Sequence, residues 1–327
     1  MNSFGRIFRV SIFGESHGVS VGVTLDGVPA GIELSESDLM PDLARRKSGG
    51  FGTTPRIEAD LPQIVSGVWN GYTTGTPLTI LFSNTNTRSS DYSKLQNHPR
   101  PSHADLTGAQ KFDGWNDPRG GGHFSGRLTL GIVAAAVVAK KILKTAEFQT
   151  QIVELGGVTN PAEFDGVVAD AVAAGDSVGG VIECRVGGIP AGLGEPFWDS
   201  VESVVAHALF AVPAVKGVEF GAGFECARMR GSEHNDAIID AQGTTATNNA
   251  GGIVGGISNG NEIVVRAAVK PTASIGLTQQ TYNFATKQIE PLKIGGRHDA
   301  CITLRAGVVV ECAIAIALAD LALINKK

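Results

Sequence analysis

Residues 125–144 read SGRLTLGIVAAAVVAKKILK, and residues 306–324 read AGVVVECAIAIALADLALI. Each run has the length and composition of a helix, and only Glu311 and Asp320 interrupt the second one. A helix that is apolar nearly all round has no face for solvent and is buried on several sides. The sequence therefore predicts two central helices covered by other elements.

Shorter elements are expected around these two runs. Two further helices are predicted at Glu36–Arg46, with Ser35 as its N-cap, and at Asp199–Phe210. Short β-rich segments alternate with turns of Gly, Asn and Thr. The expected strands are Val21–Leu25, Thr79–Phe82, Gly180–Val186 and Glu262–Ala268.

A weak internal repeat relates the two halves of the chain. The matched pairs are Gly27–Ile32 (GVPAGI) with Gly188–Leu193 (GIPAGL), Gly75–Ser83 with Gly260–Ala268, and Arg119–Leu143 with Arg297–Ile324. Chance explains any one match, but the same order in both halves indicates pseudo-twofold symmetry. We predict an α+β fold, a β-α-β sandwich of two pseudo-symmetric halves with buried apolar helices between antiparallel sheets, and a single domain over residues 1–327.

Composition excludes several classes of protein. The net charge of −5 and the 6% of aromatic residues disfavour a nucleic-acid partner. The four cysteines are scattered, which is typical of a reducing cytosol, and the seven histidines show no metal-ligand spacing. Met1–Val10 lacks a signal-peptide core, and the apolar runs Ile132–Ala139 and Ala313–Ala319 are too short for a bilayer. We expect a soluble cytoplasmic protein with no membrane segment.

The densest group of polar motifs is RPSHAD, residues 100–105, followed by DPRGGGHFSGR, residues 117–127. Three consecutive glycines before a helix cost entropy, and their physical use is a backbone concavity that attracts an anion. Arg100, Arg119 and Arg127 would add bidentate donors. The alternative is a flexible surface loop with solvated arginines. No P-loop is present, and Ser125 stands where the dinucleotide fingerprint requires its third glycine.

Three other segments carry candidate chemistry. His17 in GESHG, residues 14–18, is either a general acid or an ordinary turn histidine, and the same alternatives hold for His103. In GGRHD, residues 295–299, Arg297 would hold an anion, and Asp299 is a proton acceptor or simply an N-cap. The turn KPTAS, residues 270–274, either grips a cofactor or only ends a strand.

Together with NNAGG at residues 248–252, these motifs resemble the chorismate synthase family along nearly the whole chain. The resemblance implies a homotetramer that binds reduced FMN. It also implies an anti-1,4-elimination of phosphate from 5-enolpyruvylshikimate 3-phosphate, without net redox change, that forms chorismate. Whether the protein reduces its flavin with NAD(P)H or depends on an external flavin reductase stays open.

The resemblance also implies roles for individual residues. His17 would protonate the departing phosphate, His103 would keep the flavin in its required ionic form, and Asp299 would relay a proton from the flavin edge. The substrate-binding residues would be Arg46, Arg100, Ser125, Arg127 and Arg297. The cofactor-binding residues would be His123, Phe124, Ser125, Gly255, Lys270, Pro271, Thr272, Ala273, Ser274 and Arg297.

The sequence departs from the family pattern at two places. Residues 123–127 read HFSGR where the family has Arg-Ser-Ser-Ala-Arg, so His123 replaces an arginine only when it is protonated. Gly52 stands where the family has a second arginine after Arg46, and Arg56 is the nearby substitute. Two other functions remain as alternatives, a flavin oxidoreductase and a non-catalytic phosphometabolite-binding protein.

Overall fold

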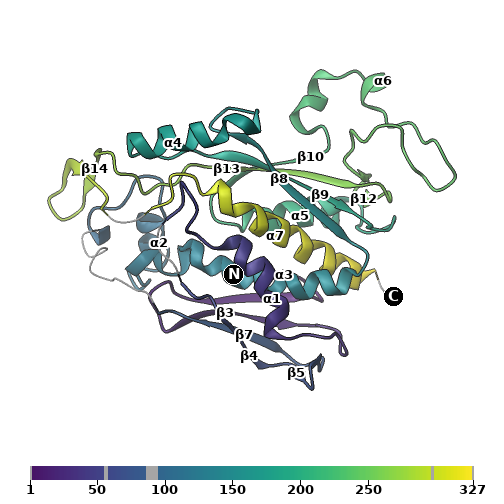
Figure 1. Cartoon of the computed structure of the whole chain (residues 1–327), viewed down its shortest axis with the longest axis horizontal. Coiled ribbons are helices and arrows are strands. Elements are labelled where there is room, and N and C mark those ends of the chain that lie inside the picture. The colour runs from purple at the N-terminus through teal and green to yellow at the C-terminus, as the bar shows by residue number, and fades with distance from the viewer. Residues whose placement is uncertain (1, 55–57, 86–94, 296–297, 326–327) are drawn as a thin grey trace.

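Two antiparallel sheets enclose a layer of helices in the computed structural model, which describes residues 2–54, 58–85, 95–295 and 298–325 (Figure 1). One sheet comes from the first part of the chain and the other from the second part, and the long helices lie between them. The predicted α+β sandwich with helices between antiparallel sheets is confirmed.

The two sheets share one strand order. The first sheet runs β1 (Ser3–Phe4), β2 (Arg9–Gly14), β3 (Ser20–Asp26), β7 (Leu78–Ser83) and β4 (Pro62–Ser66). The second runs β8 (Glu147–Leu155), β9 (Gly180–Gly187), β13 (Ile263–Val269) and β10 (Val215–Phe220). All neighbouring strands in both sheets are antiparallel. Apart from β1, each strand of one sheet therefore has its counterpart in the other.

The repeated Gly-Pro motifs make the same turn in each half. Gly27 follows β3 with φ +76°, and Gly188 follows β9 with φ +72°. A Cβ atom at these positions would lie 1.8 Å from the Ile7 carbonyl oxygen and 1.9 Å from the Thr145 carbonyl oxygen. Both turns therefore require glycine for its left-handed backbone and for the close approach of another strand.

The hydrogen bonds that hold these two turns also correspond. The Thr73 hydroxyl donates to the Pro29 carbonyl at 2.7 Å, and the Ser258 hydroxyl donates to the Pro190 carbonyl at 2.7 Å. The two hydroxyl oxygens then accept the backbone N–H of the third residue after each proline, at 2.9 Å in both halves. Together with the strand order, these bonds establish the pseudo-symmetry that the repeat predicted.

The layer between the sheets contains α1 (Glu36–Arg46), α3 (Thr129–Leu143), α5 (Val201–Phe210) and α7 (Thr303–Ile324). The N-cap of α1 is Ser35, whose backbone N–H donates to the Asp38 carboxylate at 2.8 Å. The predicted first residues of α3 and α5 are wrong. Residues 126–128 form a separate 3₁₀ turn before α3, and Phe197–Asp199 forms another before α5, because Ser200 caps that helix by accepting the Ser203 N–H at 3.0 Å.

The centre of the core is the packing of α3 against α7, and nearly every residue of both helices is buried. The charged residues that interrupt the apolar run of α7 are inside the protein. Asp320 accepts the backbone N–H groups of Arg6, Ile7 and Phe8 at 2.8–2.9 Å. By length and composition α7 is able to cross a membrane, but its burial between the two sheets makes it a core helix.

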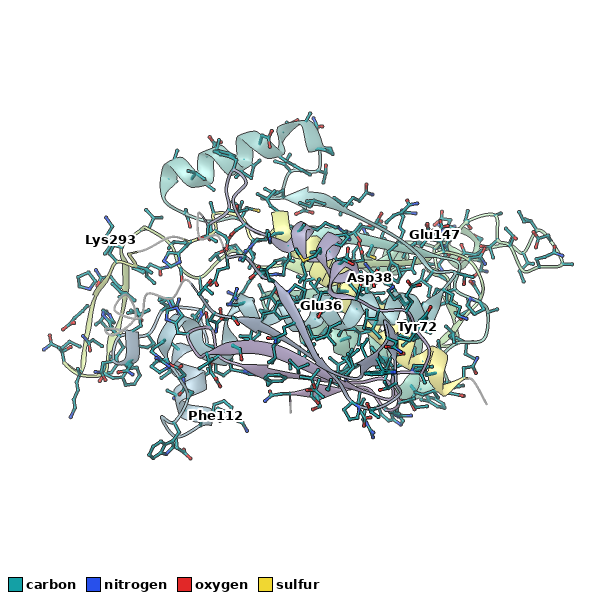
Figure 2. All side chains as sticks on the ribbon, turned by 60° about the horizontal axis from the view of Figure 1, so that its bottom comes forward. Glu36, Asp38, Tyr72, Phe112, Glu147 and Lys293 are labelled. Carbon is teal, nitrogen blue, oxygen red and sulfur yellow. The ribbon has the colours of Figure 1, made fainter. Side chains whose placement is uncertain are left out.

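Smaller elements surround the sandwich. They are α2 (Asp105–Lys111), α4 (Phe164–Ala174), α6 (Gly231–His234) and the strand pairs β5–β6 (Val68–Trp69, Tyr72–Thr73), β11–β12 (Ile253–Val254, Ile257–Ser258) and β14–β15 (Gln279–Asn283, Gln288–Leu292). Phe112, at the end of α2, and Lys293, after β15, lie at the same end of the molecule (Figure 2). The central helices α3 and α7 begin at this end (Figure 1).

Glu311 joins three helices and a strand through buried charge. Its carboxylate accepts two hydrogen bonds from Arg45 on α1 at 2.8 and 2.6 Å, one from Lys140 on α3 at 2.6 Å and one from Thr150 on β8 at 2.8 Å. Burial alone would raise the pKa of Glu311, but these donors outweigh it and lower that pKa to about 2. The carboxylate is therefore charged at neutral pH.

We predict that Glu311→Gln lowers the free energy of unfolding at pH 7 by about 3 kcal/mol, because it leaves two cations without their buried partner. The contribution of Glu311 is complete above its ordinary pKa of 4.5 and is lost as pH falls through about 2. Urea unfolding at pH 7 and at pH 3 measures both effects. Glu262→Gln, which breaks an exposed pair with Arg185, is the control and is expected to cost less than about 1 kcal/mol.

Candidate active site

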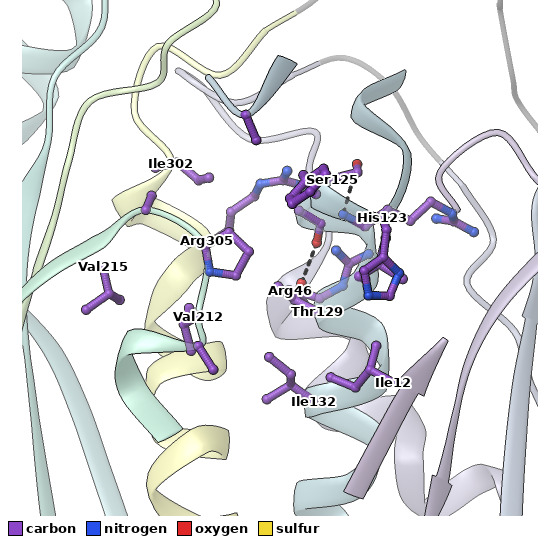
Figure 3. Close-up of a pocket in the computed structure, with 18 of the residues that line it drawn as sticks. Ile12, Arg46, His123, Ser125, Thr129, Ile132, Val212, Val215, Ile302 and Arg305 are labelled. Atoms are coloured by element: carbon purple, nitrogen blue, oxygen red, sulfur yellow. Dashed lines mark hydrogen bonds between the residues drawn. The ribbon is translucent and has the colours of Figure 1, made fainter. Parts of the chain in front are cut away.

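A cavity of about 790 Å³ opens where α3 and α7 begin (Figure 3). Its apolar wall includes Ile12, Ile132, Val212 and Val215. Most of the residues that the sequence assigned to a site line its polar part. They are Arg46, Arg100, His103, His123, Phe124, Ser125, Arg127, Lys270, Pro271, Thr272, Ala273, Ser274 and Asp299.

Two assigned residues, His17 and Gly255, are described but do not line the cavity, and a third lies outside the described residues. Arg297 lies outside the described residues, as does Arg56, the suggested substitute for the arginine missing at position 52. Gly255 forms the turn between β11 and β12, away from the cavity wall. His17 is buried directly behind Gly120, and Gly120 itself lines the cavity.

The three-glycine loop runs between two imidazoles. Gly120, Gly121 and Gly122 all have positive φ, at +62°, +81° and +54°. A Cβ atom at Gly120 would lie 2.5 Å from the His17 ring, and one at Gly121 would lie 3.4 Å from the His103 ring. The loop needs glycine for its left-handed backbone and for the space that these rings occupy.

His103 is oriented by a buried carboxylate. Its Nδ1 atom lies 2.6 Å from Asp105 Oδ1, and Arg100 donates to both oxygens of Asp105 at 2.7 Å. Burial would raise the pKa of Asp105, but Arg100 and His103 outweigh it and hold that pKa well below its usual range. Because an ionised carboxylate only accepts hydrogen bonds, Nδ1 of His103 carries a proton, and Nε2 is the atom free to exchange one.

Arg46 and Arg127 share the carboxylate of Asp60. Arg46 Nη2 donates to one oxygen at 2.7 Å and Arg127 Nη1 to the other at 2.8 Å. Burial lowers the pKa of Arg46 to about 10, assisted by the charges of Arg305 and Arg127. Arg46 Nε is buried and has no hydrogen-bond partner in the described part of the chain. This corner of the cavity therefore favours an added anion.

Asp299 connects the start of α7 with the segment after α1. Its Oδ1 atom accepts the Thr54 N–H at 3.0 Å, and its Oδ2 atom accepts Arg305 Nη2 at 3.2 Å. Both Asp299 and Arg305 line the cavity. His298 beside them also lines it, and burial together with the charges of nearby Arg100 and His103 lowers its pKa.

The segment Lys270–Ser274 follows β13 along the cavity wall. Arg100 Nη1 donates to Ser274 Oγ at 2.9 Å, which ties this segment to the motif that holds His103. Burial and the charge of Lys216 lower the pKa of Lys270. The Thr272 hydroxyl is buried without a partner among the described residues, so it is available to a bound molecule.

The two departures from the family pattern have different structural consequences. His123 lines the cavity, and its Nδ1 atom lies 2.8 Å from the Gly14 carbonyl oxygen, so Nδ1 carries a proton and donates it to that oxygen. Gly52 has φ +75°, and a Cβ atom there would lie 2.2 Å from Val168 Cγ1. A side chain at position 52 would thus meet an apolar cluster.

The charged residues of the site that the sequence did not assign include Glu58, Asp60, Asp105 and Arg305. Asp105 could have been found because it ends the RPSHAD motif, two residues after the histidine that it orients. Arg305 has a partner nearby in the sequence, Asp299, but no motif marks it, and Glu58 and Asp60 pair with Arg127 from a distant part of the chain. Asp60 and Arg127, for example, are 67 residues apart in the sequence.

Comparisons with known proteins identify relatives of this chain in sequence and in structure. The family model for chorismate synthase matches residues 8–323. Curated relatives with the name chorismate synthase include those of Chitinophaga pinensis, 59% identical over 100% of this chain and 98% of the relative, and of Dehalococcoides mccartyi, 46% identical over 98% and 96%. A crystal structure of chorismate synthase superposes with a TM-score of 0.75 at 29% identity, over 98% of this chain and 92% of that one.

We predict that Gly120→Ala displaces the His17 ring and destabilises the protein by about 1–2 kcal/mol, because alanine is strained at positive φ. Gly126→Ala is the matched control, since Gly126 also lines the cavity but has open space around a Cβ atom. Urea unfolding measures the stability, and histidine ring signals in NMR spectra report the movement, with His17→Asn for assignment. An unmoved His17 signal in Gly120→Ala would contradict the packing described for this loop.

Proposed function

This chain belongs to the chorismate synthase family, and we propose that its cavity performs that reaction with reduced FMN and the residues assigned to it above. The chain is a carbon–oxygen lyase that eliminates phosphate from 5-enolpyruvylshikimate 3-phosphate and forms chorismate, the last step of the shikimate pathway to aromatic amino acids. The observation that carries the assignment of residues is the glycine loop between His17 and His103 at the edge of a cationic cavity.

The cavity has the size and donors that a flavin mononucleotide needs. Its volume of about 790 Å³ is within the range of roughly 300–1,000 Å³ for cofactor and ligand sites. The unpartnered Thr272 hydroxyl and the Lys270 ammonium line it, and both suit an anionic or hydroxylated group. We assign flavin binding in this cavity to Lys270–Ser274, Ser125, His123 and Phe124, together with Arg297. A contact of Gly255 with the flavin is implied only by the family resemblance, because Gly255 does not line this cavity.

When bound, reduced FMN supplies electron density that assists the departure of the allylic phosphate. The chain's own residues manage protons around it. His17 protonates the departing phosphate, and its burial behind Gly120 keeps the imidazole away from bulk water. His103 exchanges its proton at Nε2, because Asp105 holds the proton on Nδ1. Asp299, held by Thr54 and Arg305, relays a proton away from the flavin edge.

Arginines neutralise the three anionic groups of the substrate. Arg46 offers its Nε atom, which has no partner among the described residues, and Arg127 and Arg100 add to the cationic wall. Arg297 is proposed as a further substrate-binding arginine. Arg100 and Arg127 are held in place by carboxylates, so they present a fixed positive field and lose little side-chain entropy when substrate binds. Ser125, which caps the turn before α3, contributes a hydroxyl to the same wall.

We also propose that residues 1–327 act as one domain in a cytoplasmic homotetramer. One cavity draws on both halves of the chain, which supports a single functional unit. Phe197, Trp198 and Phe224 are 74–90% exposed, and such apolar surface is typical of subunit contacts. Reduction of the flavin comes either from NAD(P)H bound by this protein or from an external flavin reductase.

The test is an anaerobic incubation of the pure protein with 5-enolpyruvylshikimate 3-phosphate and chemically reduced FMN. Chorismate and phosphate should form in equal amounts without matching oxidation of NAD(P)H. Product that requires equal NAD(P)H consumption would indicate a flavin oxidoreductase, and binding without turnover would indicate a phosphometabolite-binding protein. A second reaction, with oxidised FMN and NADPH in place of the chemical reductant, decides between self-reduction and an external reductase.

We predict that His17→Ala and His103→Ala each lower turnover by about 10²-fold or more, the usual contribution of a general acid or base. Substrate affinity should fall much less, because both rings exchange protons and neither supplies the main anion contacts. Turnover comes from the anaerobic assay and affinity from calorimetry. His234→Ala, in α6 outside the cavity, is the control. Turnover equal to wild type in both site variants would reject these roles.

We predict that His123→Arg flattens the pH dependence of reduced-FMN binding in the neutral range and tightens binding at high pH. An imidazole loses its charge as pH rises through neutrality, whereas a guanidinium keeps it, so binding of the FMN phosphate should weaken more with rising pH in the wild type than in the variant. Flavin fluorescence titrations from pH 5.5 to 8.5 measure this. The other histidines are the same in both proteins, so the comparison isolates position 123. Identical profiles would mean that His123 is a neutral spacer.

A further inference from the structure

Arg305 is an arginine of this cavity that has unused donors in the described part of the chain. It lies in the first turn of α7 and lines the cavity, with its side chain 19% exposed (Figure 3). Nη2 donates to Asp299 Oδ2 at 3.2 Å, a long bond for a charged pair. Within the described residues, Nε and Nη1 have no hydrogen-bond partner. One edge of this guanidinium is therefore open to a ligand.

Two of the arginines that the sequence assigned to the substrate are already bound by the protein through all three donor nitrogens. Arg127 uses Nε, Nη1 and Nη2 on Asn84, Asp60 and Ser83. Arg100 donates from Nε and Nη2 to Asp105 and from Nη1 to Ser274. Their charges are largely balanced by buried carboxylates. A substrate anion thus gains more hydrogen bonds from Arg305 than from either of these residues.

The charge around Arg305 favours an anion at the same place. The positive charge of Arg305 helps to lower the pKa of buried Arg46, so the two guanidinium groups repel each other across the cavity. Arg46 Nε is also without a partner in the described part of the chain. Both arginines border the space beside Ser125 (Figure 3). A carboxylate or phosphate there accepts from both and relieves their repulsion.

We infer that Arg305 binds an anionic group of the substrate directly through Nε and Nη1, while Nη2 holds Asp299. This inference rests on the proposed function, because it takes 5-enolpyruvylshikimate 3-phosphate as the ligand. The substrate has two carboxylates and a phosphate, and each of them matches the planar donor edge. Occupation of this site places a fixed negative charge beside Asp299, the residue assigned to relay a proton from the flavin edge.

The test is calorimetric binding of 5-enolpyruvylshikimate 3-phosphate, without reduced flavin, to wild type and Arg305→Gln. We expect the affinity of Arg305→Gln to fall about 10- to 100-fold, the scale of a charged hydrogen bond. Arg305→Lys keeps the charge but loses the bidentate edge, so its affinity should be intermediate. Arg185→Gln, whose ion pairs with Glu183 and Glu262 lie outside the cavity, should bind like wild type.

Two smaller ligands identify the anionic group. Shikimate 3-phosphate lacks the enolpyruvyl carboxylate, and chorismate lacks the phosphate. If Arg305→Gln also loses affinity for shikimate 3-phosphate but not for chorismate, Arg305 binds the phosphate. If it loses affinity for chorismate but not for shikimate 3-phosphate, Arg305 binds the enolpyruvyl carboxylate. If it loses affinity for both, Arg305 binds the ring carboxylate. Each of these results supports direct contact.

Asp299→Asn separates direct contact from an indirect effect, because it alters the same hydrogen bond from its other end. If Arg305 contacts the substrate directly, Asp299→Asn should keep a substrate affinity close to that of the wild type, and Arg305→Gln should lose affinity. Equal losses in both variants, or no loss in Arg305→Gln and Arg305→Lys, overturn the inference. If wild type itself does not bind the substrate, the proposed function fails instead. Thermal unfolding of each variant shows whether it is folded.

Discussion

The structure depends on the mutual burial of α3 and α7. Neither helix has a polar face, so the pair is stable in water only when both sheets cover it. The repeat relates one helix to the other, and both begin at the same end of the sandwich (Figure 1). Burying polar groups along the length of α3 and α7 would cost free energy, so functional polar groups lie at the ends of these helices. The loops that precede the two helices therefore form one cavity.

Burial of the central helices also determines what their few charges do. Glu311 and Asp320 lie in a helix that is otherwise apolar, and each is surrounded by donors from other elements. Leaving such a carboxylate without partners would cost several kcal/mol, roughly the stability of a typical domain. These groups thus specify which segments pack on α7: α1 and α3 through Glu311, and the first residues of the chain through Asp320.

The sequence predicted those elements of the fold that depend mainly on neighbouring residues, such as helices, strands and turns. Apolar runs marked α3 and α7, β-rich segments marked the central strands, and GVPAGI with GIPAGL marked the repeated turns. The site was predictable where its residues sit in a motif, as with His103 and Lys270. Asp60 and Arg305 could not be found in this way. Asp60 acts through Arg127, which only the folded chain brings close to it, and Arg305 lies six residues after Asp299 but outside any motif that marks it.

The carboxylates of the site resolve a conflict between stability and binding. A cavity for a substrate with three anionic groups needs several cations, but unpaired buried guanidinium groups would repel one another and destabilise the free protein. Asp60 and Asp105 balance Arg46, Arg127 and Arg100 before any ligand arrives. The charge that remains available is then held by groups with some access to water, such as Arg305 and Lys270, for which the cost of a free cation is smaller. Binding completes their coordination without breaking the pairs that keep the walls in place.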